Sequence, residues 1–100
     1  MEWEMAWGEL DQIFGAYVRQ ETLENAAREM AENAETYPEL RATFDNAIAD
    51  GLQRAEAGDI RSCQSVENSG YYAKTPNEAA NLIRELQALF SNECARRGVR

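Results

Sequence analysis

Apolar side chains recur along this chain at intervals of three and four residues, the spacing that lines them up on one face of an α-helix. The first such segment runs from about residue 1 to residue 19, and it is interpreted as one helix with Gly15 at a point of close packing. Its apolar face comprises Trp3, Trp7, Leu10, Phe14, Tyr17 and Val18.

A second helix is expected after Thr22, a residue type that favours the N-cap position. Because most of its apolar side chains are small, this helix can lie close to a neighbour but buries little area. The apolar stripe comprises Leu23, Ala26, Ala27, Met30, Ala31 and Ala34.

A third helix is predicted after Thr36 and Glu39, which are spaced as in a capping box. Pro38 falls in its first turn, where a missing amide is tolerated. The helix should end near Gly58, a residue type that commonly terminates helices. Its apolar positions are Leu40, Phe44, Ala47, Ile48, Leu52 and Ala55.

The last helix has the clearest boundaries. Thr75 is expected at the N-cap, Pro76 at the first helical position and Glu78 at the third, with Gly98 as the stop. Two arginines, Arg96 and Arg97, fall in the last turn, where cations favour the helix dipole. The apolar face comprises Ala79, Leu82, Ile83, Leu86, Leu89 and Phe90.

No segment alternates as a strand would, so residues 1–100 are predicted to form an all-α, single-domain bundle of four to five helices. The connection between the third and last helices is long for a structureless loop. Asp59 is therefore expected to cap a short helix whose inner side is formed by Ile60, Cys63 and Val66.

A loop with a turn signal at residues 68–70 follows this short helix and ends in two adjacent tyrosines, Tyr71 and Tyr72. If one tyrosine points inward, the other faces water, where tyrosine is an effective interface residue. The alternative is that both tyrosines pack over the helix ends.

The chain carries a net charge of −8, and this charge is uneven along the sequence. Residues 1–59 hold 14 acidic and 4 basic residues, a net of −10, whereas residues 60–100 hold 4 acidic and 6 basic residues, a net of +2. Such acidity disfavours direct binding to nucleic acid or to an anionic membrane and fits a basic protein partner. The alternative is that the acidity only confers solubility.

The absence of histidine excludes histidine-based nucleophile pairs and general bases. No phosphate-binding glycine motif occurs, and no cofactor or metal site is predicted, since two cysteines are too few for structural zinc. We expect a protein without catalytic activity, located in the cytosol, because neither a signal peptide nor an apolar run of about 18 residues is present. In that compartment, Cys63 and Cys94 are expected as reduced thiols.

The segment LDQIFGAY at residues 10–17, followed by Arg19 and Gln20, resembles the N-terminal part of immunity proteins from bacterial contact-dependent growth inhibition systems. The layout of YPEL before Phe44, and of Gly70-Tyr71-Tyr72 before the last helix, is similar to that family as well. The resemblance implies a cytosolic protein that binds and blocks the C-terminal toxin domain of its own system's secreted effector. Many such toxins are nucleases, whose surfaces are basic because they hold phosphates.

Six residues are candidate contacts with a basic toxin domain: Asp45, Asp50, Glu56, Asp59, Tyr71 and Tyr72. Asp45 and Asp50 diverge by more than a right angle on a helix, so not all of the carboxylates can meet one partner. Two other functions remain open. One is a helical structural or adaptor subunit, for which the Trp3 and Trp7 stripe offers a surface for homodimerisation, and the other is a small enzyme that uses carboxylates alone.

Overall fold

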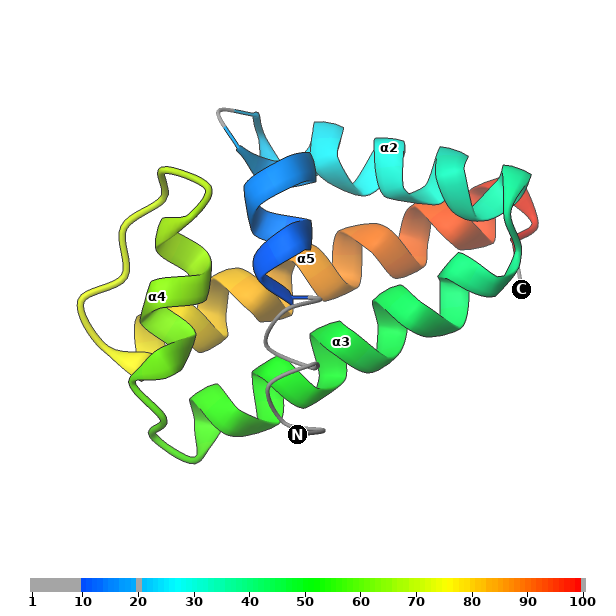
Figure 1. Cartoon of the computed structure of the whole chain (residues 1–100). Helices are drawn as coiled ribbons and strands as arrows, with labels where there is room; N and C mark the ends of the chain where they lie inside the picture. The colour runs from blue at the N-terminus through cyan, green and yellow to red at the C-terminus, as the bar shows by residue number, and fades with distance from the viewer. Residues whose placement is uncertain (1–9, 20, 100) are drawn as a thin grey trace.

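The computed structural model describes residues 10–19 and 21–99, which form an all-α bundle. In chain order the elements are η1 (Ile13–Val18), α2 (Leu23–Thr36), α3 (Glu39–Glu56), α4 (Arg61–Glu67) and α5 (Pro76–Arg97). Helix α5 is central, because α2, α3 and α4 all pack against it (Figure 1). Helix η1 crosses the bundle between α2 and α4, and α4 lies beside the start of α5.

Helix α2 forms where its sequence predicts. The Thr22 hydroxyl accepts a hydrogen bond of 3.1 Å from the backbone N–H of Asn25, as an N-cap residue should. Its buried residues are the six of the predicted stripe, Leu23, Ala26, Ala27, Met30, Ala31 and Ala34.

Helix α5 also keeps its predicted limits. The Thr75 hydroxyl accepts from the backbone N–H of Glu78 at 3.2 Å, Pro76 opens the helix, and Gly98 ends it with a φ of 72°. The Glu78 carboxylate also accepts from the N–H of Lys74, the residue before the N-cap, at 3.1 Å, so Glu78 holds the start of the helix through both its backbone and its side chain. The predicted face is buried or partly buried, and Cys94 extends it by another turn.

The capping box predicted at Thr36 is wrong. Thr36 is the last residue of α2, and its hydroxyl donates to the carbonyl of Glu32 at 3.3 Å, as a threonine inside a helix commonly does. The residue at the N-cap of α3 is Pro38, which has a helical backbone and makes no side-chain cap. The two helices are therefore joined by a tight turn through Tyr37, whose carbonyl accepts from the N–H of Leu40.

The first helix differs from a regular α-helix. Residues 10–12 are α-helical, but Ile13–Val18 is a π-helix, a wider turn with i→i+5 hydrogen bonds. Leu10, Phe14 and Val18 are buried as predicted, whereas Trp3 and Trp7 lie outside the described residues.

A polar cluster ties this first helix to α4. Asp11 pairs with Arg61 through oxygen and nitrogen atoms 2.6 Å apart, and it also accepts a 2.5 Å hydrogen bond from the buried hydroxyl of Ser65. Arg61 donates in turn to the Ser65 hydroxyl at 3.2 Å. Three side chains therefore satisfy one another across two elements, which fixes how η1 sits on α4.

The long connection contains the short helix α4, as expected. Its N-cap position is taken by Ile60, which makes no side-chain cap, and the carboxylate of the preceding residue, Asp59, accepts from the N–H of Arg61 at 3.0 Å. Cys63 and Val66 are buried, but the inward placement of Ile60 is wrong, since 68% of this residue is exposed. The inner side is completed by two serines, and one of them, Ser62, donates to the carbonyl of Asp59 at 2.7 Å.

The two tyrosines that follow α4 point in different directions. Tyr71 is partly buried, and its hydroxyl donates to the carbonyl of Glu21 at 3.2 Å. Tyr72 is 69% exposed. One tyrosine therefore packs and the other faces water, and the alternative with both packed is excluded.

A glycine lets the first helix approach α3 closely. A Cβ atom added at Gly51, which is buried on α3, would lie 2.6 Å from one methyl carbon of Leu10 and 3.2 Å from the other. Leu10 is itself fully buried, so it has no free space into which it can move. By contrast, the nearest atom to a Cβ at Gly15 is 4.0 Å away.

Gly51→Ala should therefore destabilise the fold while Gly15→Ala should not. Overpacking costs about 1–3 kcal/mol, and the better helix propensity of alanine offsets about 1 kcal/mol of it. We expect Gly51→Ala to lower the free energy of unfolding by about 1 kcal/mol, a fall in Tm of roughly 4–8 °C. Gly15→Ala should leave Tm unchanged or higher in the same thermal melts. Equal Tm values for the two variants would show that Leu10 does not press on Gly51.

Candidate protein-binding surfaces

The candidate carboxylates on α3 are each held by an arginine. Asp45 pairs with Arg41 at 2.7 Å, and Asp50 pairs with Arg54 at 2.8 Å, each one helical turn away. Glu56 pairs with Arg84 of α5 at 2.7 Å. The carboxylate side chains remain 36–52% exposed, so each keeps a face open to solvent while its arginine fixes its direction.

The structure does not bring the four candidate acids together. Glu56 meets an arginine of α5, and the partner of Asp45 also contacts α5, so both lie on the α5 side of α3. Asp50 follows Ala47 by three residues and therefore lies near the side of α3 that faces η1. Asp59 is half-buried, and its carboxylate accepts from the N–H of Arg61 at the start of α4.

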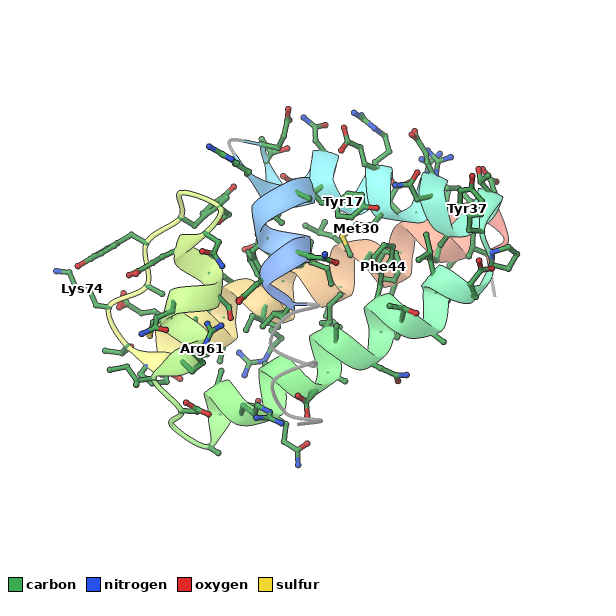
Figure 2. The ribbon with its side chains drawn as sticks, viewed as in Figure 1. Tyr17, Met30, Tyr37, Phe44, Arg61 and Lys74 are labelled. Carbon is green, nitrogen blue, oxygen red and sulfur yellow. The ribbon has the colours of Figure 1, made fainter. Side chains whose placement is uncertain are left out.

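The loop that carries Tyr71 and Tyr72 lies at the end of the bundle formed by α4. Lys74, in the same loop, points away from the helices, at the opposite end of the molecule from Tyr37 (Figure 2). Tyr72 is thus an exposed aromatic residue at a different place from the carboxylates of α3.

Most arginine side chains in the described part of the chain form ion pairs within the molecule. Six of them form ion pairs with carboxylates: Arg41, Arg54, Arg61, Arg84, Arg96 and Arg97. Within the described part of the chain, seven glutamates form no ion pair: Glu21, Glu24, Glu29, Glu39, Glu67, Glu78 and Glu85. The charged side chains that are left without an ion pair are therefore mostly acidic.

Arg41 is the most connected of these arginines. Its hydrogen bond to Asp45 raises the pKa of the guanidinium, which also donates to the carbonyl of Val99 at 3.1 Å. The same group lies 5.5 Å from the centre of the Phe90 ring, within the range of a cation–π contact. It therefore joins α3 to α5 at Phe90 and to the segment that follows α5 at Val99.

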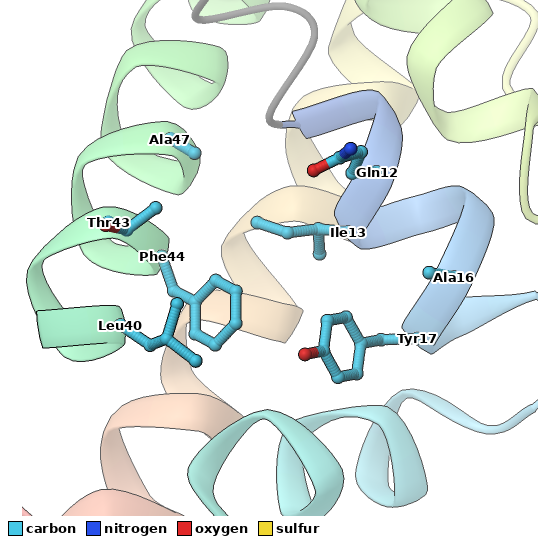
Figure 3. Close-up of a pocket in the computed structure, with 8 residues that line it drawn as sticks. All are labelled: Gln12, Ile13, Ala16, Tyr17, Leu40, Thr43, Phe44 and Ala47. Carbon is cyan, nitrogen blue, oxygen red and sulfur yellow. The ribbon is translucent and has the colours of Figure 1, made fainter. Parts of the chain in front are cut away.

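A groove between η1 and α3 is a surface that the sequence did not reveal (Figure 3). It has a volume of about 350 Å³, and none of the side chains that line it is charged. One wall belongs to η1 and the turn before it, and the other to α3. The lining residues are Gln12, Ile13, Ala16, Tyr17, Leu40, Thr43, Phe44 and Ala47.

The floor of the groove is held by aromatic contacts. The rings of Tyr17 and Phe44 meet edge to face with centroids 5.5 Å apart, and Phe44 meets Phe90 in the same way at 5.7 Å. The Tyr17 hydroxyl accepts a 2.7 Å hydrogen bond from the side-chain amide of Asn33 on α2. The helical spacing of these aromatic residues in the sequence predicts that they belong to the core. It does not predict that a space stays open beside them.

Other kinds of site are not found in the described part of the chain. No group of three or more histidine, cysteine, aspartate or glutamate residues in it could hold a metal ion. No helix among the described residues is both long and apolar enough to cross a membrane.

Comparisons with known proteins identify no relative of this chain. No protein-family model matches this chain, and searches of the curated proteins and of the solved structures find no match either.

The hydroxyl of Tyr17 should contribute to stability, and that of Tyr72 should not. Tyr17→Phe removes a partly buried hydrogen bond and leaves the Asn33 amide unpaired, a loss of about 1 kcal/mol. Tyr72→Phe is the matched control, because that side chain is exposed and should change stability by less than about 0.5 kcal/mol. Urea denaturation of both variants measures the difference. No difference between them would mean that the groove floor is not tied to α2 as described.

Cys63 and Cys94 are free thiols, and both are buried. Burial raises the pKa of the Cys94 thiol, against a smaller opposing effect of Arg41. Because the thiolate is the form that reacts, alkylation of the folded protein at pH 8 should be far slower than in urea, with Cys94 slower than Cys63. Mass spectrometry over time follows both sites. Rapid modification of Cys94 in the folded protein would contradict its burial.

Proposed function

We propose that this chain is a non-catalytic immunity protein that binds and neutralises the C-terminal toxin domain of its own contact-dependent growth inhibition effector in the cytosol. The observation that carries the proposal is the unbalanced acidity. The net charge is −8, and many of the basic side chains are engaged inside the molecule. The resemblance of residues 10–17 to that family supports the same role.

The acidity favours a basic protein as the partner. Opposite charges across an interface raise the association rate and exclude partners of the wrong sign. A nuclease domain fits this requirement, because it must present basic groups to phosphates. An acidic protein that covers those groups would compete directly with the nucleic acid substrate.

A carboxylate enzyme is less well supported. General acid–base catalysis needs carboxylates beside a cavity that holds the substrate. None of the residues lining the 350 Å³ groove is acidic, and Asp45, Asp50 and Glu56 each point to an arginine.

Co-expression tests the proposal. The toxin domain is sought as the C-terminal part of a very large secreted protein encoded directly upstream. Cells that express this domain should stop growing, and growth should return when this chain is expressed with it. The two proteins should then co-purify. Continued growth arrest together with failure to co-purify would refute the immunity role.

Substitutions of the carboxylates and of the tyrosines should change different rate constants of toxin binding. Asp50→Asn and Glu56→Gln remove exposed charge, so they should mainly slow association, by a few fold, and reduce its salt dependence. Tyr72→Ala removes an exposed aromatic side chain, so it should mainly speed dissociation, by roughly 30-fold or more at a hot spot. Tyr71→Ala should do the same but also loses the hydrogen bond to Glu21.

Surface plasmon resonance at several salt concentrations measures both rates. Glu29→Gln on α2 is the matched control for charge, because it removes one exposed carboxylate away from α3 and the tyrosine loop. Unchanged rates in all four variants would place the interface elsewhere.

A further inference from the structure

We propose that the groove between η1 and α3 receives an aromatic side chain from a basic segment of the partner protein. The inference rests on the proposed function for one point only, that the partner is a protein. All other support for it comes from the groove, its aromatic floor and the charged residues around it.

The groove has the size and lining that an aromatic side chain needs. Its volume of about 350 Å³ is at the lower end of the range for small-molecule pockets, so it suits one ring better than a large ligand. Most of its lining is apolar, and Gln12 and Thr43 supply polar atoms, one from each wall.

The space stays open because its walls carry small residues. Ala16 on η1 and Ala47 on α3 come from opposite walls, and larger side chains at these positions would reduce the space between them (Figure 3). Ala16 is exposed while Ala47 is buried, so a side chain added at Ala16 meets less of the folded core than one added at Ala47. The wall that carries Ala16 is the π-helix, an irregular turn that is frequent at functional sites.

The floor is rigid and aromatic. Tyr17, Phe44 and Phe90 form a series of edge-to-face contacts, and Asn33 holds the Tyr17 hydroxyl. An aromatic ring that enters the groove can meet Tyr17 or Phe44 in the same geometry, which adds to the free energy gained from burying its area. Little order is lost on binding, because these rings are already fixed.

The charge around the groove selects a basic segment. Glu39 precedes Thr43 by four residues, and Asp50 follows Ala47 by three, so one carboxylate lies near each end of the α3 wall. Glu39 forms no ion pair within the described part of the chain, and the Asp50 carboxylate, which pairs with Arg54 at 2.8 Å, keeps 36% of its side chain exposed.

The two carboxylates are close enough for one short segment to meet both. Their backbone positions lie about 16 Å apart along the helix, at 1.5 Å per residue. A tripeptide with a lysine on each side of a tryptophan can reach both, since an extended chain advances about 3.3 Å per residue and lysine side chains are long. A second copy of this chain is a poor occupant, because two chains of −8 repel.

Three acetylated peptide amides test the proposal on the isotope-labelled full chain by NMR. Lys-Trp-Lys should bind with a Kd on the order of 1 mM and shift the signals of Ile13, Ala16 and Leu40. Glu-Trp-Glu should bind roughly fivefold to tenfold more weakly, and Lys-Gly-Lys should leave the groove signals unchanged. Equal binding of the two tryptophan peptides, or shifts confined to other surfaces, would overturn the proposal.

A filled groove supplies the matched control. Ala16→Phe places a ring at the mouth and should abolish the shifts caused by Lys-Trp-Lys. Ala49→Phe adds the same ring at an exposed position on another side of α3 and should leave binding intact. If Ala16→Phe does not fold, Thr43→Phe fills the groove from the α3 wall. Binding that survives a filled groove, or a dimer of the wild-type chain that Ala16→Phe dissociates, would refute the proposal.

The outcomes separate this inference from the immunity role. Peptide binding without any toxin binding would keep the groove as a binding site for basic aromatic segments and refute the immunity role. A toxin domain that binds Ala16→Phe and the wild-type chain at the same rates would refute the groove as its anchor and leave the immunity role standing.

Discussion

The edge-to-face contact between Phe44 and Phe90 joins α3 to the central helix α5, and the positions of η1 and α2 and the floor of the groove depend on it. Tyr17 extends this aromatic series to η1, and the guanidinium of Arg41 lies over the Phe90 ring. Because Tyr17 also accepts from Asn33, the series reaches α2 as well. One continuous set of rings therefore fixes three helices relative to α5 and forms the floor of the groove.

The sequence predicts the regular helices well because their signals are local. Thr22 and Thr75 cap where they should, and the alanine stripe of α2 is buried as expected. The errors occur where tertiary contacts decide. Thr36 has the residue type of a cap but lies inside a helix. Ile60 is apolar yet exposed, whereas Ser62 and Ser65 are buried on α4, where they donate to the carbonyl of Asp59 and to Asp11.

The candidate binding residues were only partly predictable. The split between Tyr71 and Tyr72 is one of two arrangements that the sequence allows, and the exposure of Tyr72 and the hydrogen bond of Tyr71 decide for it. That Glu56 meets Arg84 does not follow from the sequence, since the pair is separated by 28 residues and depends on how α3 and α5 cross. The groove was not predictable either, because one of its walls is a π-helical turn, and Ile13–Val18 has the apolar spacing of an ordinary helix.

The alanine face of α2 has a consequence for hydrogen exchange. Small side chains bury little area, so α2 should open more readily than the central helix, and its amides should exchange sooner. Each such opening breaks the hydrogen bond from Asn33 to Tyr17 and loosens the groove floor. An occupant of the groove that needs this floor in place therefore disfavours the open form. Binding of such an occupant would therefore be detected as slower amide hydrogen exchange along α2, a helix that lines no part of the groove.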